Sequence, residues 1–170
     1  GKYVDLKDAY KSLDEALVHG GIKNNVKIKI IRIESDKLKI SEIRKKLINA
    51  SGILIPGGFG KRGTEGKIAC INYARKNNIP FLGICFGMQM AVIEFARNVL
   101  KIKKAGSSEL DKKCFSVVGL IEEWSKNGKI VKGTSAKLGG TMRLGLYTEK
   151  LQHNSHIKDI YKTKNIPERH

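Results

Sequence analysis

The chain has 170 residues, and its 33 Lys and Arg against 16 Asp and Glu give a formal net charge of +17. Because 41% of the residues are hydrophobic, the chain can bury an ordinary core, which excludes a disordered or fibrous protein. Its apolar runs fall far short of the ~20 residues of a membrane-spanning helix, and its first residues lack a signal-peptide pattern. We therefore expect one soluble domain in the cytoplasm, with no membrane partner.

The positive charge first suggests a nucleic-acid partner. The lysines, however, are spread along nearly the whole chain, and only 6% of the residues are aromatic. A solvated, lysine-rich surface is therefore the favoured interpretation, and no nucleic-acid partner is expected. A basic nucleic-acid-binding domain stays open as an alternative, which salt-dependent binding would reveal.

The cysteines indicate neither disulfides nor a metal site. Cys70, Cys85 and Cys114 are odd in number and form no CxxC pair. We expect no metal in this chain, whereas a single reactive thiol remains open.

Three elements are predicted in the first fifty residues. Apolar positions at helical spacing predict a helix over 8–19, which Gly20 and Gly21 would end. The β-branched residues of 26–33, which begin by alternating with lysines, predict a strand. A second helix is expected to begin near Ser41 and to place Ile43, Leu47 and Ile48 on one face.

The middle of the chain alternates short apolar runs with helical patterns. Buried strands are predicted at 52–56 and 81–84, and helices at 65–77 and 86–99; Ile68, Ile71 and Ala74 face inward. This order predicts an α/β fold with a parallel or mixed central sheet flanked by helices, in which sites form at the carboxyl ends of strands. After residue 105 the pattern weakens: 115–124 is strand-like, 125–129 indicates a hairpin turn, and 130–133 could form a second strand.

The most informative motif is Gly83-Ile84-Cys85-Phe86-Gly87, which follows a predicted strand and opens a predicted helix. This is the nucleophile-elbow pattern with Cys in place of Ser. The two glycines would remove side chains that collide in so sharp a turn. The helix N-terminus would stabilise a Cys85 thiolate, and the N–H of Phe86 would be free to hold an oxyanion. A buried cysteine between packing glycines is the alternative.

A second glycine-rich turn, Pro56-Gly57-Gly58-Phe59-Gly60, ends the preceding strand. Neighbouring parallel strands would place the two turns side by side, so this turn could supply a second oxyanion donor. It could equally be a tight connection that needs positive φ angles. Lys61 and Arg62 could meet an anionic ligand or simply be solvated.

Four segments carry a resemblance to a known family: PGGFGKRGTEGK at 56–67, PFLGICFGMQMAVIEFARNV at 80–99, SSELD at 107–111 and LGGTMRLG at 138–145. Together they resemble the class I glutamine amidotransferase domains of CTP synthases, and the similarity runs from Gly1 to His170. The resemblance implies the class I glutamine amidotransferase fold, which is flavodoxin-like.

The resemblance implies a glutaminase site. Cys85 matches the nucleophile that forms a γ-glutamyl thioester and releases ammonia, and Gly57 and Phe86 match oxyanion-hole donors. The positions that match contacts to the substrate L-glutamine are Gly58, Phe86, Gly87, Met88, Gln89 and Glu109. Glu109 is chemically suitable, because a carboxylate can pair with the α-ammonium group of an amino acid.

The resemblance also implies an effector and partners. Phe59 and Arg62 match contacts for GTP, the allosteric activator, and 138–145 matches a lid segment. In the family, an upstream synthase domain uses ATP and Mg²⁺ to convert UTP to CTP in pyrimidine biosynthesis, and the whole enzyme is a homotetramer. No cofactor is implied for the glutaminase domain itself.

The departure from the family concerns the general base. The family has a histidine base and an orienting glutamate in a late His-Pro-Glu segment, as triad chemistry needs, and this sequence contains no such segment. None of His19, His153, His156 and His170 matches the base. We therefore expect residues 1–170 to form a glutamine amidotransferase domain that is incomplete at its C-terminus, with the upstream synthase domain absent. Another class I amidotransferase, or a non-catalytic regulatory module of the same fold, remains an alternative.

Overall fold

The computed structural model describes residues 1–6, 8–119, 123–126, 129–132 and 145–169. The chain divides into two compact units, Gly1–Gly119 and Leu120–His170, which are treated separately below. Within the described ranges, no helix is long and apolar enough to cross a membrane.

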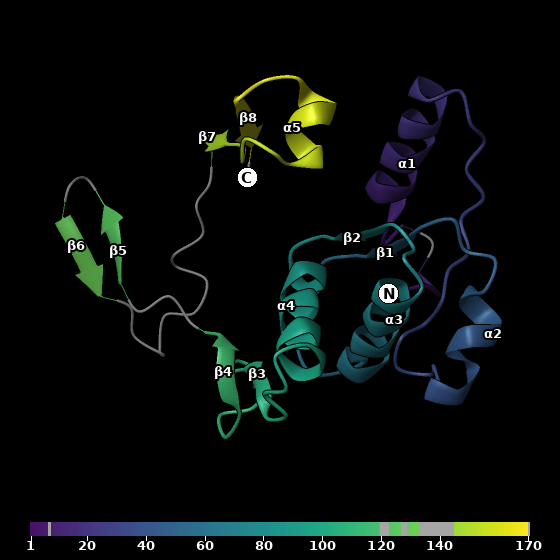
Figure 1. Cartoon of the computed structure of the whole chain (residues 1–170), viewed down its shortest axis with the longest axis horizontal. Coiled ribbons are helices and arrows are strands. Elements are labelled where there is room, and N and C mark those ends of the chain that lie inside the picture. Colours follow the sequence, from purple (N-terminus) through teal and green to yellow (C-terminus); the bar gives the residue numbers. More distant parts are fainter. Residues whose placement is uncertain (7, 120–122, 127–128, 133–144, 170) are drawn as a thin grey trace. The chain divides into compact units, whose positions relative to one another are not determined.

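The first unit is built on a parallel strand pair covered by helices (Figure 1). Strand β1 (Ile53–Ile55) pairs in parallel with β2 (Phe81–Gly83). Helices α3 (Thr64–Lys76) and α4 (Phe86–Asn98) pack on each other and on both strands. The predicted parallel α/β arrangement is confirmed, and each predicted boundary of these four elements holds to within one residue.

Buried side chains of these elements form the core. The strands bury Ile53 and Ile55, and α4 buries Phe86, Met90 and Ile93. The inward residues predicted for α3 are all buried, namely Ile68, Ile71 and Ala74. Helical spacing of apolar residues thus correctly identifies the face that α3 turns to the strands. A second parallel pair, β3 (Ala105–Ser107) with β4 (Phe115–Val118), packs against α4.

Helix α1 (Lys11–Lys23) begins three residues later than predicted and continues past Gly20 and Gly21, which lie inside it instead of ending it. Gly21 is buried, and a Cβ there would stand 2.8 Å from Ile28 Cγ1. The absence of a side chain at Gly21 therefore lets Ile28 pack closely against the helix. The helix ends at Lys23; two residues further on, Asn25 has a φ of 54°, and the N–H of Val26 donates to the Gly21 carbonyl. An asparagine in the left-handed conformation therefore ends the helix.

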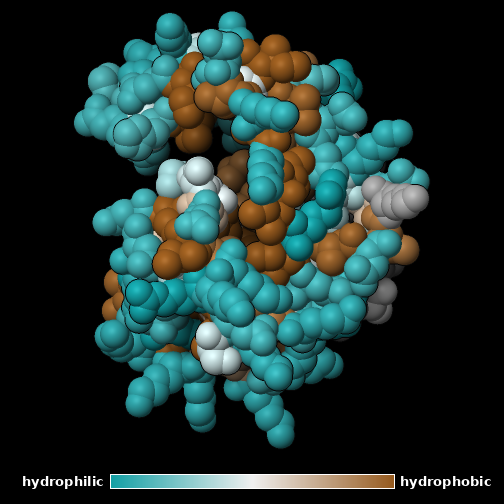
Figure 2. Space-filling model, turned by 90° about the vertical axis from the view of Figure 1, so that its right-hand side faces the viewer, coloured by the Kyte–Doolittle hydropathy of each residue, from teal (hydrophilic) through white to brown (hydrophobic). Residues whose placement is uncertain are grey.

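The strand predicted at 26–33 is wrong for the described chain, which has no ladder there. The hydrogen bonds at its end join Gly1, whose backbone nitrogen donates to the Ile33 carbonyl and whose carbonyl accepts from the Ser35 N–H. An alternating pattern becomes a strand only when a neighbouring chain supplies ladder bonds. Val26, Ile28 and Ile31 are exposed. On the face drawn in Figure 2, patches of hydrophobic residues lie among the hydrophilic ones.

The helix predicted near Ser41 is short. A 3₁₀ turn, η1 (Ile40–Glu42), leads into α2 (Ile43–Leu47), and Ser41 lies inside the turn instead of capping the helix. Ile43 and Leu47 are buried as predicted, but Ile48 is 57% exposed. The helix has already ended at Leu47, so Ile48 no longer follows its buried face.

The described residues of the second unit form two antiparallel pairs. Strands β5 (Glu123–Lys126) and β6 (Lys129–Lys132) pair with Lys126 opposite Lys129, which confirms the predicted hairpin. Strand β7 (Leu146–Lys150) pairs with β8 (Asn165–Arg169), and α5 (His156–Tyr161) lies between them in sequence. These last three elements were not predicted. The strand expected at 115–124 is divided between β4 and β5, and positions 138–144 of the lid-like segment lie outside the described residues.

Candidate functional site

Cys85 occupies a sharp turn between a strand and a helix. Strand β2 ends at Gly83 and α4 begins at Phe86, so only two residues make the connection. Cys85 has φ 52° and ψ −108°, a backbone conformation that is costly for a residue with a side chain. Its side chain is exposed. The chain thus holds a thiol in a strained conformation at the surface, as an elbow requires.

The flanking glycines allow the close packing that the elbow needs. A Cβ at Gly83 would stand 2.7 Å from the backbone carbon of Gly87. A Cβ at Gly87 would overlap the carbonyl oxygen of Ile55 on β1. The sequence-based argument that these glycines prevent collisions is confirmed.

The first turn of α4 leaves the amide after the cysteine available. The N–H of Gly87 donates to the Ile84 carbonyl at 2.8 Å, and the N–H of Gln89 donates to the Cys85 carbonyl at 3.2 Å. As the first helical residue, Phe86 has no intrahelical acceptor for its N–H. In the same turn Met88 is exposed and Gln89 is half-buried.

The glycine-rich turn after β1 lies beside the elbow, as predicted for neighbouring parallel strands. A Cβ at Gly57 would stand 3.6 Å from the Cβ of Cys85, an ordinary contact distance. Gly58 is half-buried, whereas the side chain of Phe59 is 76% exposed. The two turns therefore lie side by side, and Cys85 lies between the start of α4 and the backbone of Gly57–Phe59.

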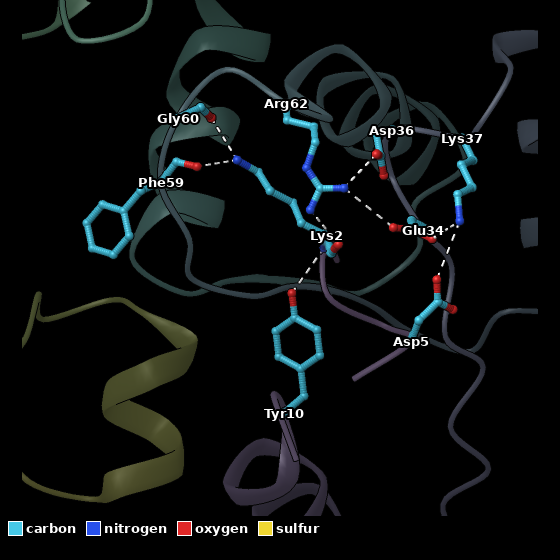
Figure 3. A network of polar contacts seen from close by, with 9 residues as sticks. All are labelled: Lys2, Asp5, Tyr10, Glu34, Asp36, Lys37, Phe59, Gly60 and Arg62. Atoms are coloured by element: carbon cyan, nitrogen blue, oxygen red, sulfur yellow. Dashed lines mark hydrogen bonds and ion pairs between the residues drawn. The ribbon is translucent and has the colours of Figure 1, made fainter. Parts of the chain in front are cut away.

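Two buried lysines lie behind this surface, which the expectation of solvated lysines missed. Lys2 is only 3% exposed, and its ammonium group donates to the carbonyls of Phe59 and, at 2.7 Å, of Gly60 (Figure 3). The Nζ atom also lies 5.1 Å from the centre of the Phe86 ring. Burial and the neighbouring Arg62 lower the pKa of Lys2.

The second buried lysine, Lys67 on α3, is fully buried, and its Nζ atom has no hydrogen-bond partner among the described residues. It lies 4.7 Å from the centre of the same Phe86 ring and would lie 3.8 Å from a Cβ at Gly58. Burial, with repulsion from Lys2 and Arg62, lowers the pKa of Lys67 to about 8. The face of an aromatic ring attracts cations, which offsets part of this cost.

Arg62 is committed to contacts within the protein. Its guanidinium donates to Asp36 at 2.7 Å and to the Lys2 carbonyl at 2.8 Å, and it lies 3.6 Å from Glu34 (Figure 3). The hydrogen bond to Asp36 raises the pKa of Arg62. Arg62 follows the glycine-rich turn by two residues, and its hydrogen bonds connect this part of the chain to Lys2 and Asp36.

Glu109 lies in the connection between β3 and β4. It is exposed, and its backbone N–H donates to the Ser107 hydroxyl at 3.3 Å. Its charge acts on the Lys2 ammonium, where it opposes the lowering of the Lys2 pKa by burial and by Arg62.

Other titratable groups are less informative. His19, on α1, is the one histidine in the first unit, whereas His153 and His156 belong to the second unit. Burial raises the pKa of Cys70 to about 11, and Cys114 is half-buried. Within the described residues no group of three His, Cys, Asp or Glu side chains could hold a metal ion.

Comparisons with known proteins show which family the chain resembles over its length. The family model described as "Glutamine amidotransferase class-I" matches residues 5–168. The chain is 69% identical over 170 residues to the CTP synthase of Pelagibacter ubique (strain HTCC1062) and 52% identical over 172 residues to that of Sphingopyxis alaskensis, and it spans 32% of the length of each. Among solved structures, it is similar to the glutaminase domain of Trypanosoma brucei CTPS with bound acivicin, with a TM-score of 0.84 and 35% identity over the whole of this chain and 63% of that one.

Proposed function

The chain belongs to the class I glutamine amidotransferase family, and from that premise we propose that it hydrolyses L-glutamine with Cys85 as the nucleophile. The observation that supports this most strongly is the elbow itself: an exposed cysteine with φ 52° directly before the first residue of α4. The alternative for Cys85 is a buried cysteine between packing glycines, and that alternative does not fit an exposed side chain.

The proposed reaction proceeds in two steps. The Cys85 sulfur attacks the side-chain amide carbon of glutamine and forms a γ-glutamyl thioester. The carbon–nitrogen bond breaks, and the amide nitrogen takes up the proton of the thiol and leaves as ammonia. Water then cleaves the thioester, which releases glutamate and restores the thiol. The backbone N–H groups of Gly57 and Phe86 would stabilise the oxyanion in each step, and the N-terminus of α4 would favour the developing negative charge.

Substrate binding is assigned to groups around the elbow. Gln89, half-buried in the first turn of α4, and the backbone of Gly58 would contact the glutamine, together with Gly87 and Met88. The exposed carboxylate of Glu109 would pair with the α-ammonium group.

The proposed general base lies outside the 170 residues of this chain. Cys85 needs a histidine to accept its proton and an acid to orient that histidine. In this proposal a His-Pro-Glu segment, which the 170 residues do not contain, supplies both in the intact gene product.

The similarity to CTP synthases over the whole chain supports a role for the ammonia. In this proposal it passes to a synthase domain of the same cytoplasmic, homo-oligomeric protein, where ATP and Mg²⁺ activate UTP for conversion to CTP. GTP would activate the glutaminase through Phe59, whose exposed ring can stack on a base, and through Arg62.

The test compares two nitrogen sources in the intact gene product. Cys85→Ala should lose glutamine hydrolysis and glutamine-dependent CTP formation by about 10³-fold or more. It should retain CTP formation from free ammonia, and Cys114→Ser should behave as wild type in both assays. An unchanged glutaminase rate in Cys85→Ala contradicts the nucleophile assignment. A wild type that uses only free ammonia would indicate a non-catalytic module, and ammonia release without CTP formation would indicate an amidotransferase with another acceptor.

A further inference from the structure

Ser107 is the attachment point of the turn that carries Glu109. Its hydroxyl oxygen accepts from the N–H of Glu109 at 3.3 Å, and its carbonyl accepts from the N–H groups of Leu110 at 2.9 Å and Asp111 at 3.0 Å. Three successive amides of the turn are therefore bound to one residue. Because Ser107 is only 4% exposed, little water can reach its hydroxyl to take over the hydrogen bond from Glu109.

The strand that carries Ser107 is held on both sides. Strand β3 is buried throughout, and the Ala105 carbonyl at its start accepts from the Arg97 guanidinium at 2.7 Å. Just after the strand, the N–H of Ser108 donates to the Val118 carbonyl on β4 at 3.1 Å. Ser107 therefore has a fixed position, and the turn takes its orientation from Ser107.

The turn borders a cavity, so packing alone does not fix it. Ser107, Leu110 and Asp111 line a cavity of about 390 Å³ between α3, α4 and β3, and the Glu109 side chain is exposed. Atoms beside a cavity lack the close neighbours that restrict movement in a packed interior. Among the described residues, Glu109 makes its one hydrogen bond to the Ser107 hydroxyl. That bond therefore sets the direction in which the Glu109 carboxylate extends.

We propose that Ser107 is a positioning residue that directs the Glu109 carboxylate toward the α-ammonium group of glutamine. Charge-assisted hydrogen bonds depend on geometry, so a displaced turn weakens the pair between carboxylate and ammonium. Ser107 thereby supports the preference of the site for an α-amino acid, although it contacts neither the substrate nor the reacting atoms. This inference rests on the proposed glutaminase function and adds the residue that orients one of its substrate contacts.

The experiment uses Ser107→Ala, Ser107→Cys and Ser107→Thr in the intact gene product, with Ser116→Ala as the matched control. Ser107→Cys keeps nearly the same volume but offers only a weak acceptor, so it tests the hydrogen bond without leaving a space. Ser116, on β4, is an exposed serine whose hydroxyl donates to the Val118 carbonyl at 3.0 Å, so its loss also removes one bond from side chain to backbone. The kcat and KM for L-glutamine are measured, and thermal unfolding shows which variants are folded.

Ser107→Ala and Ser107→Cys should each raise KM for L-glutamine by about three- to tenfold, as expected for one hydrogen bond, because substrate binding weakens. The kcat should change less than about twofold, since Cys85 and its oxyanion donors stay in place. Ser107→Thr, which keeps the hydroxyl, and Ser116→Ala should both stay within about twofold of wild type. In a Glu109→Gln protein, adding Ser107→Ala should raise KM by less than about twofold, because Ser107 acts through the Glu109 carboxylate.

Three outcomes overturn the proposal: a wild-type KM in a folded Ser107→Ala or Ser107→Cys protein, a loss confined to kcat, or an effect of Ser107→Ala that stays undiminished in the Glu109→Gln protein. Failure of the glutaminase proposal has a different signature, because the wild type itself would then release no ammonia from glutamine.

Discussion

The backbone of Gly87, in the first turn of α4, lies against the carbonyl oxygen of Ile55 at the end of β1, so closely that a Cβ at residue 87 would overlap that oxygen. This approach fixes how the helix that follows Cys85 meets the strand that leads to Gly57. The geometry of the proposed site thus depends on a contact between two backbones.

Gly87→Ala should therefore push α4 away from β1. We expect a loss of about 1 to 3 kcal/mol in stability, as for other overpacked positions, with faster hydrogen exchange in the first turns of α4. Thermal unfolding and hydrogen–deuterium exchange check this. Gly20→Ala is the control, since nothing lies within 4 Å of a Cβ there and alanine should stabilise α1 by up to ~1 kcal/mol. Equal effects at the two positions would contradict the packing argument.

Glu94 should stabilise the α3–α4 pair, because this carboxylate is 1% exposed and accepts from Arg75 at 2.8 Å and Asn72 at 2.7 Å. Glu94→Gln should cost about 1 to 3 kcal/mol in thermal unfolding at pH 7. Glu42→Gln, which breaks the exposed pair with Lys46, should cost less than about 1 kcal/mol.

The Glu94 contribution should also depend on pH. Burial acts to raise its pKa, but the hydrogen bonds from Arg75 and Asn72 outweigh burial and hold the pKa below its ordinary value of 4.5. The unfolded chain therefore binds the proton first, so the stabilisation is complete above pH 4.5 and declines as the pH falls through the lower folded value. The difference in stability between wild type and Glu94→Gln should therefore become smaller as the pH is lowered. A difference that stayed constant would contradict this.

Lys67→Met should raise stability at pH 7 by about 1 to 3 kcal/mol, because methionine fills the same space without a buried charge. The pKa of Lys67 is about 8 in the folded protein against 10.5 unfolded, so the unfolded chain binds more protons between these values. The wild type then gains stability as the pH rises through this window, and the advantage of Lys67→Met should fade toward pH 10.

Thermal unfolding of the two proteins at pH 7 and pH 10 measures that difference. Lys76→Met, an exposed position on the same helix, should stay within about 0.5 kcal/mol of wild type. A Lys67→Met protein less stable than wild type at pH 7 would show that the ammonium group has a partner that outweighs its burial.

Phe59→Ala should weaken the response to GTP without changing the stability of the fold. With 76% of its side chain exposed, Phe59 buries little apolar area, so unfolding should change by less than about 0.5 kcal/mol. Loss of a stacking surface should raise the GTP concentration for half-maximal activation by about tenfold. A normal GTP response would remove Phe59 from the proposed effector site.

Sequence patterns predicted the part of the fold that local chemistry determines. The glycines at 83 and 87 and the apolar run of β2 predicted the elbow, and Ile68, Ile71 and Ala74 predicted the buried face of α3. Parallel pairing of β1 with β2 correctly placed Gly57 beside Cys85. The roles of these residues in catalysis and binding stay predictions.

What the sequence left unpredicted depends on tertiary contacts. Nothing around Lys2 or Lys67 distinguishes them from the solvated lysines, because carbonyls and a ring from distant residues create their sites. The strand expected at 26–33 failed for a similar reason, since alternation cannot supply a ladder partner. Gly21, expected to end α1, instead makes room for Ile28.

Selective alkylation tests the central claim, that Cys85 is the nucleophile, most directly. Iodoacetamide is applied to the intact gene product with and without L-glutamine, and mass spectrometry locates the modified thiol while glutaminase activity is followed. Cys85 is exposed, whereas burial raises the pKa of Cys70 to about 11, so Cys85 should react and Cys70 should not. We predict that glutaminase activity falls in step with Cys85 modification and that glutamine slows both. Full glutaminase activity with Cys85 completely alkylated would contradict the account.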